Sequence, residues 1–213
     1  MIEVAVIDYG VGNLLSVSRA FKHCGACVTI TSDAAAILAA GRVVLPGVGA
    51  FADGMAALRA HGLDAVVRRV AGTGTPLLGI CLGMQMLLDE SEEFGVTPGL
   101  GLIPGRVVKI PATSTTGELH KIPHIGWNEL VLPAQRDSWQ GGLLADVEPG
   151  EAVYFVHSFM AEPTSPEHRL ADCRYGDIPI TAAVKRDNVM GCQFHPEKSG
   201  EVGLRVLKNF LRR

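Results

Sequence analysis

This chain of 213 residues has no marked excess of charge of either sign and no long apolar run. Its 19 Lys and Arg face 22 Asp and Glu, a formal net charge of −3, which argues against binding to nucleic acid or to an anionic membrane surface. No apolar run approaches the roughly 20 residues of a membrane span, and the strand-like segment 2–7 starts without the cationic stretch of a signal peptide. We therefore expect a cytoplasmic protein.

Cysteine is scarce, and its pattern excludes a disulfide framework. The five cysteines are odd in number, which fits a reducing compartment. Cys24 and Cys27 have C-x-x-C spacing, but no second Cys or His pair completes a zinc set, and they fall where a helix gives way to a strand. We interpret them as structural and predict neither a metal site nor a cofactor. Cys173 and Cys192 lie in strand-like segments and are predicted to be core thiols.

Short apolar strands alternate with helical segments in the first half of the chain. Helices are expected at about 13–24, 54–60 and 63–71, with a short one capped by Ser32 or Asp33 and ended by Gly41, and strands at 2–7, 28–31, 42–45 and 77–80. This order predicts a parallel, doubly wound α/β sheet with its chemistry at the carboxyl ends of the strands.

From about residue 105 strands follow one another directly. They are expected at 106–110, 128–131, 152–155, 169–174, 181–185 and 189–193, before a final amphipathic helix at about 201–211. Turns rich in Pro, Gly and Asp separate them, which predicts antiparallel additions to the parallel core. The sequence has no repeat, linker or low-complexity tract, so we predict one domain over residues 1–213.

Cys81 is the first candidate for chemistry. It follows the apolar strand 77–80, precedes the helical-looking segment 84–90, and has Gly79 and Gly83 two residues away on either side. Small residues at these two positions are typical of a strained strand-to-helix elbow that exposes a nucleophile. A thiol at a helix N-terminus is favoured as the reactive thiolate. The pattern predicts acyl transfer with sulfur as the nucleophile, although most free cysteines are only core residues.

His195 and Glu197 supply the partners that such a nucleophile needs. They lie two residues apart, so on an extended backbone both side chains would leave the same face. A carboxylate beside an imidazole holds one ring nitrogen protonated and leaves the other to accept the thiol proton. Pro196 between them restricts the backbone. A lone His-x-Glu means little, but it becomes the obvious partner of an elbow cysteine.

The segment 45–51 follows a strand and is rich in glycine. Attack on an acyl group creates an oxyanion, which needs two backbone N–H donors. The amide of Leu82, directly after the nucleophile, is one candidate, and a loop at the end of a neighbouring strand is the natural source of the second.

Together these motifs resemble the class I (triad) glutamine amidotransferases. The residues concerned are G-I-C-L-G-M-Q at 79–85, P-G-V-G-A-F at 46–51 and F-H-P-E at 194–197. Further segments, H-I-G-W-N at 124–128 above all, resemble the glutaminase subunits of imidazole glycerol phosphate synthase. The resemblance covers essentially the whole chain and implies a flavodoxin-like, single-domain sheet.

The resemblance also implies a role for each matching residue. Cys81, His195 and Glu197 would form the triad, and the amides of Val48 and Leu82 the oxyanion hole. The L-glutamine substrate would be held by Gly49, Gln85, Glu93, Ser158 and Phe159, where Phe159 stands at a position that more often carries tyrosine.

The same resemblance implies a partner, because such glutaminases pass ammonia to a cyclase of (β/α)₈ type and this chain contains no barrel. Asn13, Trp127 and Lys198 are the candidates for the partner-facing rim. Three other classes stay open at this stage. They are another class I amidotransferase, which usually has P-G-G in the oxyanion loop, a protein of the same sheet class with an elbow cysteine but no terminal His-x-Glu, and a non-catalytic binding module.

Overall fold

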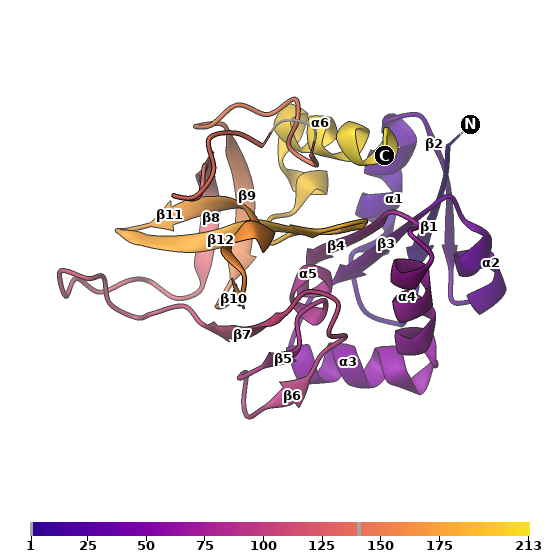
Figure 1. Cartoon of the computed structure of the whole chain (residues 1–213), viewed down its shortest axis with the longest axis horizontal. Helices are drawn as coiled ribbons and strands as arrows, with labels where there is room; N and C mark the ends of the chain where they lie inside the picture. Colours follow the sequence, from indigo (N-terminus) through magenta and orange to yellow (C-terminus); the bar gives the residue numbers. More distant parts are fainter. Residues whose placement is uncertain (1, 140–141) are drawn as a thin grey trace.

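The computed structural model describes residues 2–139 and 142–213 of the chain (Figure 1). Its first half alternates strands and helices, as the sequence predicts. The elements are β1 (Ile2–Ile7), α1 (Leu14–His23), β2 (Ala26–Thr31), α2 (Ala34–Ala39), β3 (Arg42–Gly47), α3 (Phe51–Ala60), α4 (Leu63–Gly72), β4 (Leu77–Cys81) and α5 (Leu82–Met86). Asp33 is the cap of α2, since its Oδ1 accepts a hydrogen bond from the Ala35 amide at 2.9 Å.

The second half consists mainly of strands. They are β5 (Glu90–Ser91), β6 (Thr97–Pro98), β7 (Gly105–Lys109), β8 (His124–Val131), β9 (Ala152–His157), β10 (Phe159–Pro163), β11 (Arg169–Tyr175), β12 (Ile178–Arg186) and β13 (Val189–Cys192). Short 3₁₀ turns, η1 (Pro166–His168) and η2 (Pro196–Lys198), and the helix α6 (Gly200–Leu211) complete the chain.

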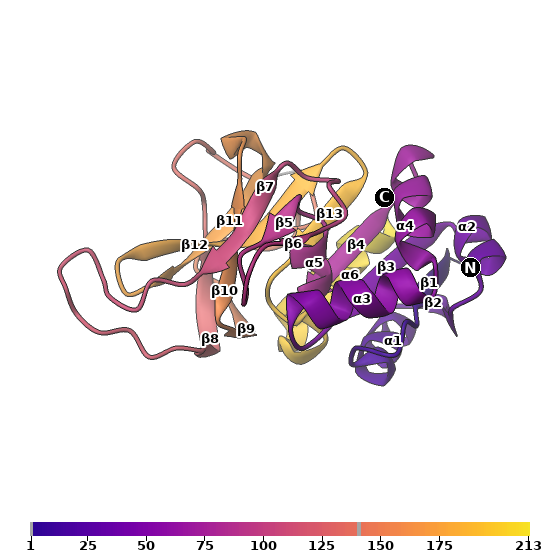
Figure 2. The ribbon, with the colours of Figure 1, turned by 90° about the horizontal axis from the view of Figure 1, so that it is seen from below.

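One nine-stranded sheet forms the centre of the molecule, in the order β2-β1-β3-β4-β13-β12-β11-β8-β9. Its first five strands pair in parallel, and the remaining pairs are antiparallel. The predicted parallel core with antiparallel additions is therefore confirmed. A second sheet, β10-β7-β5-β6, lies beside the first, and Figure 2 shows it from below.

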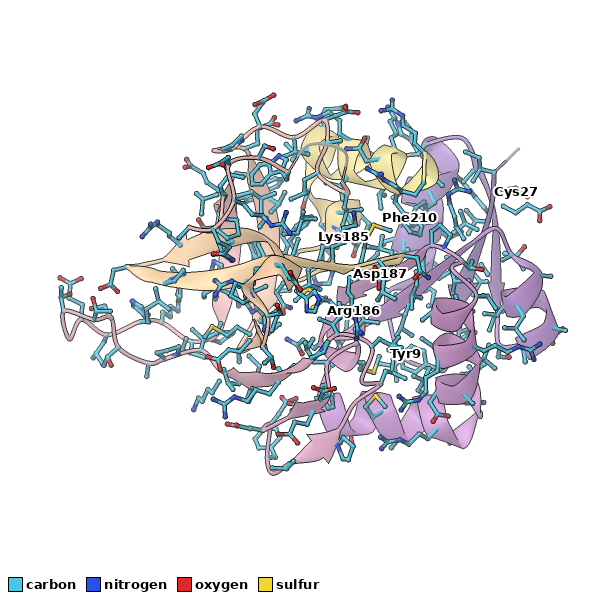
Figure 3. All side chains as sticks on the ribbon, in the orientation of Figure 1. Tyr9, Cys27, Lys185, Arg186, Asp187 and Phe210 are labelled. Carbon is cyan, nitrogen blue, oxygen red and sulfur yellow. The ribbon has the colours of Figure 1, made fainter. Side chains whose placement is uncertain are left out.

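Helices cover both faces of the parallel part. α1 and α6 lie on one face, where Phe21 and Phe210 meet edge to face with ring centres 5.9 Å apart. α2, α3 and α4 cover the other face with a separate apolar cluster that includes Ile37, Met55 and Val67 (Figure 1). Figure 3 shows Phe210 pointing inward from α6 and Cys27 at the outer edge on β2. No helix among the described residues combines the length and apolar character needed to cross a membrane.

The helix after Cys81 is shorter than the sequence predicts. It ends at Met86, whereas helical spacing continues to residue 90. The backbone carbonyls of Met86, Leu87 and Leu88 accept hydrogen bonds from amides of residues 100–103. Those tertiary bonds satisfy carbonyls at the helix end that would otherwise lack partners, and they hold the chain in the turn that leads to β5. The strands β5 and β6 were not predicted, because two residues carry no readable period, and neither was β10, which follows β9 with only Ser158 between them.

Candidate active site

Cys81 lies at the junction of β4 and α5 with a strained backbone. Its φ of 55° and ψ of −113° fall in a region that non-glycine residues rarely occupy, and such strain is concentrated at functional sites. The turn leaves no room beside it. A Cβ on Gly83 would lie 1.8 Å from the Leu45 carbonyl oxygen, and one on Gly79 would lie 2.6 Å from the Gly83 oxygen. The sequence prediction of a glycine-flanked elbow is confirmed by these contacts.

The glycine-rich loop after β3 lies next to this elbow. Parallel pairing places Gly47 opposite Cys81, so Val48 and Gly49 follow at the mouth of the site. The hydroxyl of Tyr9, which is buried, donates to the Pro46 carbonyl at 2.7 Å. A Cβ on Gly47 would come within 2.7 Å of that same hydroxyl oxygen. Tyr9 carries no local signal of this role, because nothing in the sequence connects it with a loop 37 residues away.

His195 and Glu197 lie together and are buried. His195 Nδ1 is 2.9 Å from Glu197 Oε1. The chain between them is a 3₁₀ turn, η2, and not the extended backbone that was expected. The turn is held because the His195 amide donates to Tyr154 O on β9 at 2.9 Å, and Ser199 Oγ donates to His195 O at 2.6 Å. His195 Nε2 has no hydrogen-bond partner among the described residues and is left for a ligand or a reacting group.

The electrostatics of His195 favour the imidazolium. Burial disfavours the charged ring, but interactions with Cys81 and Glu197 outweigh it and raise the pKa of His195 to about 9. Burial raises the pKa of the Cys192 and Cys173 thiols, both of which lie in the core as predicted. Of these three thiols, Cys81 is the one that lines the pocket, where it lies beside His195.

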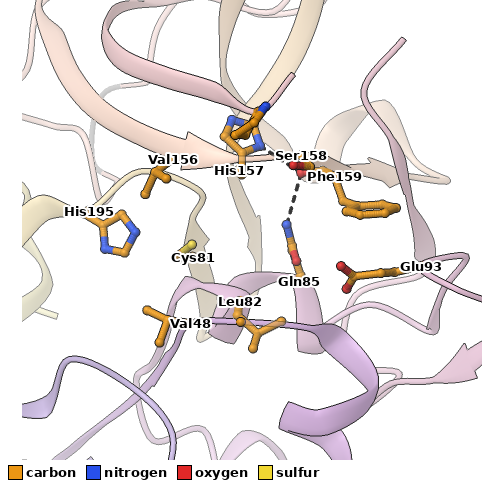
Figure 4. A pocket seen from close by; sticks show the side chains of 12 residues that line it. Val48, Cys81, Leu82, Gln85, Glu93, Val156, His157, Ser158, Phe159 and His195 are labelled. Carbon is orange, nitrogen blue, oxygen red and sulfur yellow. Dashed lines mark hydrogen bonds between the residues drawn. The ribbon is translucent and has the colours of Figure 1, made fainter. Parts of the chain in front are cut away.

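These residues line one pocket of about 320 Å³. Figure 4 shows His195 beside Cys81 at one end of it and Glu93 at the other, with Gln85 between them. The lining consists of Val48, Gly49, Cys81, Leu82, Gln85, Glu93, Pro123, Val156, His157, Ser158, Phe159 and His195. The structure thus brings together nine of the ten residues predicted for the triad, the oxyanion hole and the substrate, and Glu197 lies behind His195. The ammonium and carboxylate groups of an amino acid would find both acceptors and donors here.

Two of the lining side chains are fixed by backbone groups from distant segments. Glu93 Oε2 accepts from the Phe51 amide at the start of α3, at 2.7 Å. Gln85 Nε2 donates to the Phe159 carbonyl at 3.1 Å. Phe159 and Ser158 connect β9 to β10, so the small sheet contributes directly to the pocket wall.

A pair of buried histidines supports this wall, although the sequence motifs give neither of them a role. His157 Nδ1 donates to the Phe159 carbonyl at 2.8 Å, so its Nε2 is the acceptor that lies 3.0 Å from His124 Nδ1. Asn128 Nδ2 then donates to His124 Nε2 at 3.3 Å. Burial lowers the pKa of both histidines to about 4, which keeps them neutral. Cross-strand pairing of β8 with β9 creates this contact, and the sequence alone gives no register.

The three residues predicted to face a partner differ in their exposure. Trp127 on β8 is 58 % exposed, and Lys198 is exposed with its Nζ 5.9 Å from the centre of the Tyr154 ring. Asn13 is half-buried at the start of α1. Of the C-x-x-C pair, Cys27 is exposed and Cys24 Sγ donates to Leu204 O on α6 at 3.6 Å.

Comparison with known proteins identifies the family. The family "Glutamine amidotransferase class-I" matches residues 5–213. A protein of Legionella pneumophila (strain Lens) named imidazole glycerol phosphate synthase subunit HisH 1 is 52% identical over 212 residues, 100% of both chains. The HisH subunit of Geobacillus thermodenitrificans is 48% identical over 99% of this chain and 96% of its own.

Solved structures agree on the fold. One titled as a glutamine amidotransferase superposes with a TM-score of 0.72 at 19% identity, covering 98% of this chain and 97% of its own. PurLQS of Thermotoga maritima gives 0.70 at 21% identity, covering 99% and 98%. From the match along nearly its whole length and the high identity to HisH subunits, the chain belongs to the class I glutamine amidotransferase family.

Proposed function

We propose that this chain is the glutaminase subunit of an imidazole glycerol phosphate synthase. It hydrolyses L-glutamine to glutamate and ammonia and delivers the ammonia to a separate cyclase chain. The observation that carries the proposal is the strained elbow cysteine, Cys81, which shares one pocket with His195 and its buried partner Glu197. The 52% identity to a HisH subunit over the full length supports the specific reaction.

Cys81, His195 and Glu197 act as nucleophile, acid–base and orienting group. The Cys81 thiolate attacks the side-chain carbonyl carbon of glutamine and forms a tetrahedral oxyanion. As the C–N bond breaks, the His195 imidazolium gives its proton to the departing nitrogen and ammonia leaves, with a γ-glutamyl thioester on Cys81. Neutral His195 then takes a proton from water as the water oxygen attacks the thioester carbon. Glutamate leaves, and the thiolate–imidazolium pair is restored.

Backbone amides of Leu82 and Val48 stabilise the oxyanion in both steps. The pairing of Gly47 with Cys81 supports this assignment, because it places the amide of the following residue beside the nucleophile. Glu93 and Gln85 hold the α-ammonium and α-carboxylate end of glutamine, together with backbone groups of Gly49, Ser158 and Phe159. The Phe159 carbonyl accepts from Gln85 Nε2 and from His157 Nδ1, so the place of this residue in the pocket wall does not depend on a ring hydroxyl.

The cyclase docks on the exposed face of β8 and its surroundings. Ile125 and Trp127 are both 58 % exposed and lie on the same side of this strand. Lys198, at the end of η2, lies against Tyr154, whose ring also contacts Trp127. Asn13 forms a further part of this rim. A (β/α)₈ barrel seated there would receive ammonia without its escape to solvent and would make imidazole glycerol phosphate and an aminoimidazole carboxamide ribotide. The reaction takes place in the cytoplasm, a compartment that suits five free thiols.

Glutamate production, measured with and without the cyclase of the same organism, tests the proposal. Wild-type chain should release glutamate from glutamine, faster with the cyclase present. Cys81→Ala should release none, while its complex should still make imidazole glycerol phosphate from added ammonium salts. Cys192→Ala, a buried thiol on the neighbouring strand, is the matched control and should keep the activity. Glutamate production by Cys81→Ala would remove Cys81 from the mechanism.

A further inference from the structure

Gln193 is a fully buried polar residue that the mechanism above does not use. It follows β13 directly. Its backbone N–H donates to Ala182 O on β12 at 2.8 Å, so its backbone is fixed to the central sheet. Its side chain reaches two residues of the active site. Nε2 lies 3.6 Å from the Cys81 sulfur, and Oε1 lies 2.9 Å from Gln85 Nε2.

The Phe159 carbonyl determines which atom of each side-chain amide, in Gln85 and in Gln193, is the nitrogen and which is the oxygen. A carbonyl oxygen only accepts, so the Gln85 atom that lies 3.1 Å from it is the nitrogen. Gln85 Nε2 therefore needs an acceptor at its other contact, which fixes Oε1 of Gln193 on that side. Nε2 of Gln193 is then the atom that faces the Cys81 sulfur. The chain Phe159 O, Gln85, Gln193, Cys81 has one consistent set of donors and acceptors.

This arrangement has two consequences for the pocket. Both hydrogens of Gln85 Nε2 are used inside the protein, so the polar atom that Gln85 keeps for a ligand is its carbonyl oxygen, an acceptor suited to an ammonium group. The N–H of Gln193 that points at the sulfur favours negative charge there, because a hydrogen bond to the charged form stabilises that form.

We propose that Gln193 is a positioning residue that joins nucleophile activation to substrate recognition. It donates to the Cys81 sulfur, and it holds the Gln85 amide so that its oxygen accepts from the α-ammonium of the bound amino acid. This assignment rests on the proposed function, in which Cys81 attacks glutamine. A glutamine that only filled the core would affect the folding of the chain, and not the balance between kcat and KM.

Two substitutions separate the two roles in the complex with the cyclase. Gln193→Leu has a similar size but can neither donate nor accept. We expect kcat/KM for glutamine to fall by about 10²-fold, with a higher KM and a lower kcat. Gln193→Glu still accepts from Gln85 Nε2, but its carboxylate offers no hydrogen to the sulfur at a pH high enough to ionise this buried group, and the variant is compared with wild type there. We expect a KM within about threefold of wild type, with kcat and the rate of Cys81 alkylation by iodoacetamide reduced by about 10-fold or more.

The pH dependence provides a readout that a structural role would not change. As pH is lowered, the introduced carboxyl of Gln193→Glu gains a proton and can again donate to the sulfur. Its alkylation rate relative to wild type should therefore rise toward acid pH, whereas that of Gln193→Leu should not. Met190→Leu, a buried volume-conserving change on β13, is the control, and urea unfolding shows the folded fraction of every variant.

Each outcome decides the assignment. Values of kcat and KM for Gln193→Leu within twofold of Met190→Leu would overturn it, as would losses that only follow the folded fraction. If Gln193→Leu does not fold, Gln193→Glu decides alone, and a KM raised as strongly as kcat is lowered would overturn the assignment. Wild-type complex without glutaminase activity would instead overturn the proposed function itself.

Discussion

His195 Nδ1 lies 2.9 Å from Glu197 Oε1, with both side chains buried and the other imidazole nitrogen turned to the pocket that holds Cys81. The Glu197 carboxyl group and the Cys81 sulfur therefore both act on one imidazole ring. Together they overcome the cost of burying its charge and raise the pKa of His195 to about 9. At neutral pH the ring therefore carries a proton, which in the proposed mechanism passes to the departing ammonia.

Removal of His195, the proposed acid–base residue, should be almost as damaging to glutaminase activity as removal of the nucleophile Cys81. We expect His195→Ala to lose nearly all glutaminase activity and Glu197→Gln to lose less, because an amide can partly replace the carboxylate as the orienting group. The double variant Cys81→Ala/His195→Ala should be no worse than Cys81→Ala, since triad members act as a unit. Glutamate production in the complex provides the measurement.

In wild type the rate should also decline as pH rises through about 9, where His195 loses the proton that it delivers. Full activity in His195→Ala would point to another base. His157 is poorly suited to that role, because both its ring nitrogens already contact Phe159 O and His124.

Val48 should restrain the free glutaminase. Related glutaminases usually have a second glycine at this position, and the described residues with positive φ do not include Val48. Turning the Gly47–Val48 peptide so that its N–H points at the oxyanion would cost about 1–3 kcal/mol if that orientation needs a backbone that glycine adopts freely. Without that donor the rate would fall by about 10²–10³. Partner binding would favour the turned state.

Val48→Gly should therefore raise the basal glutaminase rate and reduce the activation by the cyclase, both measured as glutamate release. Val48→Ala keeps the Cβ and is the matched control. Basal and activated rates that stay unchanged, or that fall by one common factor, would show that the valine does not gate the site.

Gly83 should not tolerate even a methyl group. An added Cβ would lie 1.8 Å from the Leu45 carbonyl oxygen, a backbone atom that cannot move aside without separating β3 from the elbow. We expect Gly83→Ala to lower the free energy of unfolding by more than about 3 kcal/mol, measured in urea. Gly72→Ala, at a helical glycine with open space around it, is the control and should be neutral or slightly stabilising. Equal stability of the two variants would contradict the tight elbow.

Acid should destabilise the protein through the buried histidine pair. Burial lowers the pKa of His124 and His157 to about 4, whereas a histidine in the unfolded chain has a pKa of about 6.5. Between these values the unfolded chain binds more protons, so stability is greatest above pH 6.5 and is lost as pH falls toward 4. Between pH 7 and pH 5 we expect a loss on the order of 2 kcal/mol from each of the two histidines.

Urea unfolding at a series of pH values measures that loss. His124→Gln should reduce the dependence of stability on pH, and the exposed His61→Gln controls for the removal of a histidine. An equally steep dependence in His124→Gln would show that acid acts elsewhere.

Local sequence predicted most of the elements and the three residues of the proposed triad. Apolar periodicity located the helices and strands of the first half, and Gly79 and Gly83 around Cys81 predicted the elbow, because a tight turn excludes a Cβ whatever the rest of the fold does. The His-Pro-Glu segment at 195–197 indicated the partners of Cys81, although the backbone there forms a 3₁₀ turn and is not extended.

Only the tertiary structure determines which residues from distant segments become neighbours in the site. β13 returns to pair in parallel with β4, with Cys192 opposite Ile80, and that register brings Gln193 and His195 beside Cys81 from more than 110 residues away. Pairing of Gly47 with Cys81 places the oxyanion loop, and pairing of β8 with β9 creates the histidine contact. Strand register depends on how whole faces pack, so no local pattern reveals it. The early end of α5 is also a tertiary effect, since the carbonyls at and just after its end accept hydrogen bonds from residues 100–103.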